Sequence, residues 1–239
     1  MRPAPDPARA IVVVPTYNER EMLPAIAEAV LALNGWRLLV VDDNSPDGTG
    51  QMADELAARE PRVSVLHRAE KEGLGPAYLA GFSEVLKRPD VEFVFEMDAD
   101  FSHDPEDLPR LLEAARDADL VIGSRWVPGG GTKGWSLRRR LLSQWGNAYV
   151  RIALGSPVRD MTAGFRCWRR AALEAIDFGA VSAKGYGFQV EMTYRAMQAG
   201  YRVVEAPICF TERRAGKSKM SGSIVTEALA LPWRLRRGE

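Results

Sequence analysis

Residues 93–104 read Phe-Val-Phe-Glu-Met-Asp-Ala-Asp-Phe-Ser-His-Asp, a short apolar run that ends in acidic side chains. The apolar run is typical of a buried strand. Because side chains alternate along a strand, Asp98 and Asp100 would point the same way if the extended conformation continues through them. Open α/β sheets bind ligands at the carboxyl ends of their strands, and Mg²⁺ prefers one or two carboxylates together with substrate phosphates. The stretch therefore predicts a site for a metal ion and a diphosphate. The alternative is an acidic turn that leads into a helix capped by Asp104.

Strands and helices are expected to alternate before and after this stretch. Apolar runs typical of strands occupy residues 10–14, 37–41, 63–66 and 120–122, and helical spacing occurs at residues 21–33, 50–59, 76–86 and 105–115. This alternation predicts right-handed βαβ units and a mostly parallel sheet flanked by helices. After Ile122 the pattern changes to a glycine-rich loop, a long basic amphipathic helix at 137–154, a turn and strand at 160–168, a helix at 187–199, a strand at 201–208 and a basic loop at 213–223 before a last helix.

Composition limits the possible partners. The 239 residues carry 32 Lys+Arg and 32 Asp+Glu, so no overall field attracts nucleic acid. The proline-rich start lacks the apolar region of a signal peptide, and no stretch approaches the roughly 18 apolar residues of a membrane span. The two cysteines, Cys167 and Cys209, lie in apolar sequence contexts and are expected to be buried thiols of a reducing compartment and not a disulfide. We expect a protein that is soluble or peripherally bound to a membrane.

Polar residues also follow the first two predicted strands. The first strand continues into Pro15-Thr16-Tyr17-Asn18-Glu19, so it is not followed by the glycine-rich loop of a dinucleotide-binding unit. Tyr17 could stack on a base, and the carboxylates of Glu19 and Asp43 could accept hydrogen bonds from base N–H groups or ribose hydroxyls. The alternative is a pair of solvated polar turns.

Four motifs, taken in order, resemble glycosyltransferase family 2, whose fold is GT-A. They are Pro15-Thr16-Tyr17-Asn18-Glu19 and the segments at 40–49, 73–78 and 97–100. In the second half, residues 123–126, 139–143, 160–166 and 210–220 resemble the dolichol-phosphate and polyprenol-phosphate mannose synthases. The similarity is closest to the catalytic domain of the actinobacterial polyprenol monophosphomannose synthases. It extends from about Ile11 to Leu229.

The resemblance implies an inverting, metal-dependent transfer of mannose from GDP-mannose to a polyprenyl (dolichyl-type) phosphate, with Mg²⁺ or Mn²⁺ as cofactor. The residues that it assigns to the nucleotide sugar are Pro15, Tyr17, Glu19, Val41, Asp43, Asp98, Ala99, Asp100, Arg213 and Lys219. It assigns Arg125, Arg139 and Ser143 to the acceptor phosphate, and Asp98, Asp100, Arg125 and Arg139 to catalysis. The metal would be held by Asp98, Asp100 and Ser102. Some relatives have a glutamine where this chain has Ser102, so here the ligand would be a hydroxyl or a bound water.

The resemblance also implies a division of the chain. We expect a single GT-A domain at residues 10–230, with a nucleotide-binding half at 10–123 and an acceptor-binding half at 124–230. A disordered tail at 1–9 and a basic tail at 231–239 would flank it. Two other functions stay open: a transferase of the same fold that uses UDP-glucose or UDP-GlcNAc, and an inactive nucleotide-binding scaffold.

The residues themselves support the phosphate sites. An arginine fork binds phosphate oxygens with two parallel hydrogen bonds, and the loop that carries Arg213 and Lys219 could close over a polyanion. The alternative for these cations is a solvated surface. A phosphate monoester is largely dianionic near neutral pH, so we expect no catalytic base among carboxylates such as Asp160 and Glu191. Glu191 and Gln189 would instead contact a sugar or form a polar helix start.

The basic helix at 137–154 also predicts a membrane contact. Its apolar residues are Leu137, Leu141, Leu142, Trp145 and Tyr149, with arginines around them; Trp233 repeats the mixture near the C-terminus. Such helices lie in the membrane interface. We expect a cytoplasmic protein, peripheral at the cytoplasmic face of the membrane, with or without a membrane-protein partner that recruits it. The alternative is a helix that faces the core. His103 is expected to belong to the helix cap and not to the ligands.

Overall fold

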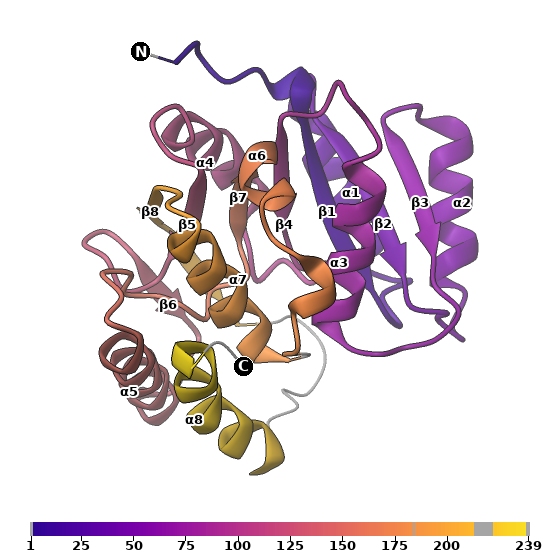
Figure 1. The fold of residues 1–239 in the computed structure, drawn as a ribbon. Coiled ribbons are helices and arrows are strands. Elements are labelled where there is room, and N and C mark those ends of the chain that lie inside the picture. The colour runs from indigo at the N-terminus through magenta and orange to yellow at the C-terminus, as the bar shows by residue number, and fades with distance from the viewer. Residues whose placement is uncertain (1, 184, 213–221, 238–239) are drawn as a thin grey trace.

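The fold was analysed in a computed structural model that describes residues 2–183, 185–212 and 222–237. Its centre is a seven-stranded sheet in the order β3-β2-β1-β4-β7-β5-β8 (Figure 1). The strands are β1 (Ala10–Thr16), β2 (Arg37–Asp42), β3 (Val63–His67), β4 (Phe93–Glu96), β5 (Leu120–Ser124), β7 (Arg166–Arg169) and β8 (Val203–Pro207). A second sheet pairs β6 (Gly131–Lys133) with β9 (Cys209–Thr211).

Helices flank the sheet. They are α1 (Leu23–Ala32), α2 (Thr49–Arg59), α3 (Leu74–Val85), α4 (Leu108–Ala114), α5 (Leu137–Leu154), α6 (Arg170–Glu174), α7 (Tyr186–Gln198) and α8 (Gly222–Arg237). Short 3₁₀ helices are η1 (Pro7–Arg9), η2 (Pro105–Asp107) and η3 (Phe178–Ala180). The prediction of an α/β fold with a mostly parallel sheet is confirmed, and the predicted helix at 137–154 has the bounds of α5.

Strand β7 is the antiparallel member of the large sheet. It pairs antiparallel with β4 on one side and with β5 on the other, whereas β1, β2, β3 and β4 are parallel to one another. The sequence analysis predicted a strand in this region but not its place in the sheet. Because of this order, a strand from the second half of the chain lies between two strands from the first half.

The buried strands alternate between two hydrophobic clusters. In β1, Ile11 and Val13 belong to the cluster under α3 and α7, whereas Val12 and Val14 belong to the cluster under α1 and α4. Strands that are buried on both faces read as continuous apolar runs. Helix α3 approaches the sheet closely, since a Cβ at Gly81 would lie 2.6 Å from Cγ1 of Val13. A larger residue at position 81 would therefore overpack the core.

The structure describes most of the two predicted tails, residues 2–9 and 231–237. The Arg2 guanidinium donates to the Asp119 carboxylate at 2.7 Å, and the Asp6 side chain caps η1 by accepting from the backbone N–H of Ala8. Residues 231–237 lie in α8, and Leu231 and Leu235 are 2% and 7% exposed. This segment is helical because it buries these leucines against α5 and α7.

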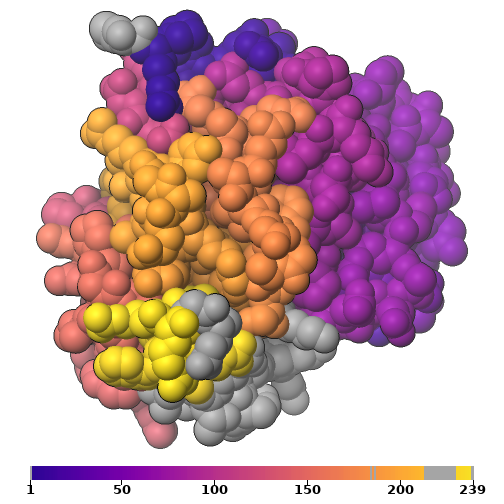
Figure 2. Space-filling view, viewed as in Figure 1, coloured from indigo at the N-terminus to yellow at the C-terminus, as the bar shows by residue number. Residues whose placement is uncertain are grey.

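Figure 2 shows the C-terminal part of α8, in yellow, at the lower left of the molecule. None of the helices in the described ranges is long and apolar enough to cross a membrane. Both cysteines are free thiols; Cys167 is buried, whereas Cys209 is exposed. The expectation of a buried thiol is therefore confirmed for Cys167 and wrong for Cys209.

Candidate active site

The acidic loop begins one residue after β4. The strand ends at Glu96, so the extended conformation on which the sequence argument depended does not continue through Asp98 and Asp100. The loop instead folds as a turn in which the backbone N–H of Ser102 donates to Oδ1 of Asp100 at 2.9 Å. Phe101 has a φ of 58°, which is rare for a bulky side chain. A local turn, and not strand alternation, therefore sets the positions of the two carboxylates.

His103 stabilises this loop from inside. Its ring is 2% exposed and stacks on Phe165, with 4.9 Å between ring centroids. Its Nδ1 accepts the backbone N–H of Asp98 at 3.2 Å, so this nitrogen is unprotonated while the bond exists. The helix cap belongs to Asp104, which accepts from the backbone N–H of Glu106, as predicted. The sequence analysis missed the role of His103; its position inside the acidic stretch was the available signal.

The loop offers oxygen ligands that suit a hard cation. Asp98 has a side chain 25% exposed, Asp100 is 7% exposed, and Ser102 Oγ is buried with no hydrogen-bond partner among the described residues. Two carboxylates and a hydroxyl are ligands that Mg²⁺ and Mn²⁺ accept. Nowhere in the described ranges do three or more His, Cys, Asp or Glu side chains form a group that could hold a metal ion by themselves.

The predicted nucleotide residues gather at the ends of β1 and β2. Pro15 and Val41 are partners in the strand register, and the backbone N–H of Asp43 donates to Thr16 at 3.0 Å. Tyr17 and Glu19 follow β1 directly. Because β1 pairs in parallel with β4, these residues and the acidic loop both lie at the carboxyl ends of the strands.

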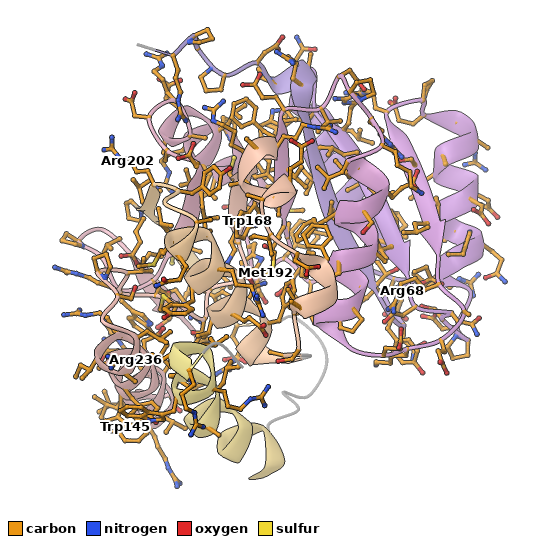
Figure 3. The ribbon with its side chains drawn as sticks, viewed as in Figure 1. Arg68, Trp145, Trp168, Met192, Arg202 and Arg236 are labelled. Atoms are coloured by element: carbon orange, nitrogen blue, oxygen red, sulfur yellow. The ribbon has the colours of Figure 1, made fainter. Side chains whose placement is uncertain are left out.

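Two cations contact the nucleotide residues. Arg68 (labelled in Figure 3) donates to Oδ1 of Asp43 at 2.5 Å. Burial raises the pKa of the Asp43 carboxyl, although the hydrogen bond from Arg68 opposes this shift. Lys71 Nζ lies 3.4 Å from the ring centroid of Tyr17, which is a cation–π contact. The sequence analysis missed both contacts. A base that stacks on Tyr17 would use the other ring face or displace Lys71.

A buried polar network lies next to the acidic loop and was not predicted. Glu96 is fully buried in β4 and accepts from Trp168 Nε1 at 2.6 Å and from Gln189 Nε2 at 2.5 Å (Trp168 is labelled in Figure 3). Burial raises the pKa of Glu96, and the positive charge of Arg166 opposes the rise. Burial also lowers the pKa of Arg166 to about 10. The signal in the sequence was a glutamate inside an apolar strand.

Arg125 is held by a buried carboxylate. It follows β5, and Asp160 accepts from its backbone N–H at 2.9 Å, from Nε at 2.8 Å and from Nη2 at 2.6 Å. Nη2 also donates to Thr162 Oγ1 at 2.9 Å. The guanidinium carbon lies 5.4 Å from the ring centroid of Trp135. The predicted phosphate fork of Arg125 is therefore engaged within the protein, which sequence reasoning did not anticipate.

Arg139 and Ser143 lie one turn apart on α5, beside this pair. Arg139 forms an ion pair with Glu212, and its guanidinium carbon lies 4.0 Å from the ring centroid of Trp135. The Asn147 amide donates to the carbonyl of Ser143 at 3.0 Å and to the Thr162 hydroxyl at 3.1 Å. The structure thus brings the three predicted acceptor residues together around Trp135 and Thr162. Arg213 and Lys219 lie outside the described residues.

The two carboxylates considered as bases are fully engaged. Asp160 is completely buried under Arg125. Glu191 is also completely buried; it accepts from the backbone N–H of Ala183 at 2.9 Å and from Arg195 at 2.7 Å. Glu191, near the start of α7, therefore binds the loop at residues 182–183 and is not placed to contact a sugar.

The order of the strands and the flanking helices give this chain the GT-A fold. The solved structures that resemble this one agree. A mannosyltransferase from Pyrobaculum calidifontis, in complex with GDP-Man and Mn²⁺, has a TM-score of 0.66 at 20% identity, over 99% of this chain and 67% of that one. Glucosyl-3-phosphoglycerate synthase from Mycobacterium tuberculosis, with Mn²⁺, UDP-glucose and phosphoglyceric acid, has a TM-score of 0.66 at 18% identity, over 96% and 79%.

Sequence similarity identifies the family. The family model for glycosyl transferase family 2 matches residues 11–177, and the chain belongs to this family. It is 55% identical to the polyprenol monophosphomannose synthase of Mycolicibacterium smegmatis, over 92% of this chain and 84% of that protein. It is 54% identical to the undecaprenyl-phosphate mannosyltransferase of Micrococcus luteus, over 92% and 91%. The predicted family and GT-A fold are confirmed.

Proposed function

We propose that this chain transfers mannose from GDP-mannose to a polyprenyl (dolichyl-type) phosphate, with inversion at the anomeric carbon. The observation that carries the proposal is the cluster of Arg125, Arg139 and Ser143, in which each arginine is paired with one carboxylate, Asp160 or Glu212, and could bind or neutralise a phosphate. The names of the two relatives described above, from Mycolicibacterium smegmatis and Micrococcus luteus, point to the same acceptor class and sugar.

The nucleophile in this reaction is an oxygen of the acceptor phosphate. A phosphate monoester has a second pKa of about 6, so near neutral pH it attacks without deprotonation. The protein has to position it and to offset the repulsion between the acceptor and the donor diphosphate. Arg139 and Ser143 would bind the phosphate, while Arg125, fixed by Asp160, contributes positive charge beside it. One displacement at the anomeric carbon inverts its configuration.

The donor side completes the proposal. Pro15, Tyr17, Glu19, Val41 and Asp43 would bind the guanosine at the ends of β1 and β2. Ala99 would contact the donor within the acidic loop, and Arg213 and Lys219 would bind the diphosphate, on the sequence resemblance alone. Asp98, Asp100 and Ser102 would hold Mg²⁺ or Mn²⁺, which neutralises charge on the departing GDP when bound.

Helix α5 is proposed to contact the membrane. Leu137, Trp145 and Ile152 are 71%, 61% and 78% exposed, whereas Val150 and Leu154 are buried, so only part of the helix faces the core. Trp145 lies at the outer side of the molecule (Figure 3). Exposed apolar residues among arginines are typical of helices in an anionic membrane interface. A peripheral position at the cytoplasmic face, with or without a recruiting partner, would present Arg139 and Ser143 to lipid-borne phosphate.

The test is a transfer assay with the purified chain. GDP-mannose, UDP-glucose and UDP-GlcNAc are each offered with a short-chain polyprenyl phosphate and Mg²⁺, Mn²⁺ or a chelator. Transfer from GDP-mannose that the chelator abolishes supports the proposal. Transfer from a UDP-sugar alone would replace the donor, and binding without turnover from any donor would identify a scaffold.

A further inference from the structure

The two arginines of the acceptor cluster are paired with carboxylates in very different surroundings. The side chains of Arg125 and Asp160 are 9% and 0% exposed. Those of Arg139 and Glu212 are 33% and 40% exposed. Removing one partner from a buried ion pair is strongly destabilising, whereas an exposed pair contributes little and is screened by salt. Arg125 therefore keeps its carboxylate, while Arg139 can exchange its carboxylate for another anion.

The backbone holds Glu212 beside α5. Lys133 in β6 pairs with Thr211 in β9, and the N–H of Glu212 donates to the carbonyl of Lys133 at 2.8 Å. Gly134 has a φ of 84°, and a Cβ at this position would lie 2.8 Å from Cβ of Glu212. Because Gly134 has no side chain, Glu212 can pack against its backbone. The pairing of β6 with β9 fixes the position of the Glu212 backbone, from which its side chain reaches Arg139.

Arg139 has a second anchor that does not depend on Glu212. Its guanidinium lies over the ring of Trp135, 4.0 Å from the centroid. A cation–π contact of this kind keeps a guanidinium in place while its edge exchanges hydrogen-bond acceptors. The donors of Arg139 would therefore stay oriented if the Glu212 carboxylate left.

We propose that the Glu212 carboxylate is an internal substitute for the acceptor phosphate, and that it makes Arg139 selective for dianionic phosphate monoesters. This inference rests on the proposed function, because that function assigns Arg139 to the acceptor. A phosphate monoester carries a charge of about −1.5 to −2 at pH 7 and forms charge-assisted hydrogen bonds with arginine, so it can displace the single charge of a carboxylate. A phosphodiester, such as an ordinary phospholipid headgroup, carries only one negative charge. Its attraction to Arg139 is therefore no stronger than that of the Glu212 carboxylate, and it does not displace that carboxylate. The residue thus discriminates against the bulk lipids of a membrane.

The experiment compares Glu212→Gln with Glu174→Gln in the full chain. Glu174 is a matched control, since its side chain is 48% exposed and pairs with Arg170 at 2.6 Å on α6, so both variants lose one negative charge from an exposed ion pair. Steady-state kinetics give KM and kcat for a short-chain polyprenyl phosphate at fixed ionic strength. Inhibition is measured with dihexanoylphosphatidylglycerol, a soluble anionic phosphodiester, below its micellar concentration.

We expect Glu212→Gln to lower the acceptor KM about two- to fivefold, the range set by the small net contribution of an exposed pair. Inhibition by the phosphodiester should strengthen by a similar factor, and kcat should change less than twofold. Glu174→Gln should match the wild type in all three. Glu212→Gln should have no further effect on KM in an Arg139→Ala background, because the glutamate acts through that guanidinium.

Other results overturn the inference. An unchanged KM and unchanged inhibition in Glu212→Gln would show that the carboxylate does not compete. A raised KM would show that Glu212 orients Arg139. Circular dichroism and the matching Glu212→Ala variant separate either result from misfolding. If the wild type transfers no mannose to polyprenyl phosphate, the proposed function fails as well; if it does and the variant behaves as the wild type, this inference alone fails.

Discussion

The Arg125–Asp160 pair should contribute strongly to stability, and Asp160→Asn tests this. The asparagine keeps one oxygen that can accept the backbone N–H of Arg125, but it leaves the guanidinium buried, with its side chain 9% exposed, beside a neutral partner. Loss of one partner from a buried ion pair destabilises a protein by about 3–5 kcal/mol. In a chain of this size each kcal/mol lowers Tm by about 2–4 °C, so the expected decrease is roughly 6–20 °C.

Urea unfolding at pH 7.5 and thermal melts followed by circular dichroism measure the effect. Glu174→Gln is the control for an exposed pair and should lose about 1 kcal/mol or less. Combining Asp160→Asn with Arg125→Met removes the unpaired cation but keeps the backbone hydrogen bond. This double variant should be more stable than Asp160→Asn alone. A loss below about 1 kcal/mol in Asp160→Asn, or a double variant that is no more stable, would refute the reasoning.

Three further outcomes are expected. Asp98→Ala and Asp100→Ala should each lower turnover at saturating Mg²⁺ or Mn²⁺ at least about 100-fold, or about 2.7 kcal/mol, and near-normal turnover in both would remove the acidic loop from the mechanism. Arg139→Ala should raise the acceptor KM and leave GDP-mannose binding, measured by calorimetry, unchanged; equal weakening of both substrates would argue against an acceptor role. Because burial raises the folded-state pKa of Glu96 above the ordinary value of 4.5, the stability that protonated Glu96 provides is fully present below pH 4.5 and is lost as the pH rises through the folded-state pKa. The free energy of unfolding of the wild type minus that of Glu96→Gln should therefore fall from pH 4 to pH 8, and a rise would contradict the shift.

Much of the architecture could be predicted because strands and helices leave local patterns of apolar residues in the sequence. The buried strands of the first half are continuous apolar runs, and α5 shows its bounds through helical spacing, the Ser136 cap and Gly155 in a left-handed conformation at its end. Residues that directly follow neighbouring parallel strands must meet at one sheet edge, which is why Tyr17 and Asp43 could be grouped from the sequence.

The side-chain partners could not be predicted, because they come from distant parts of the chain. The sequence contains many carboxylates that could pair with the arginines of the acceptor cluster, and the observed partners Asp160 and Glu212 are 35 and 73 positions away. The Glu96–Gln189 hydrogen bond spans 93 positions. Strands β6 and β9 have three residues each, too few for alternation to show.

The insertion of β7 between β4 and β5 has a consequence for how the chain is made. Until residues 166–169 leave the ribosome, β5 has no hydrogen-bonded connection to the sheet of β1 to β4, and β8, whose partner is β5, has none either. A fragment of the first 124 residues should therefore leave β5 without a strand partner, although β1 to β4 can still pair with one another. If the chain were cut between β5 and β7, β7 of the second fragment would have to insert between β4 and β5 of the first. A split-protein reporter cut there would therefore report reassembly of the whole sheet.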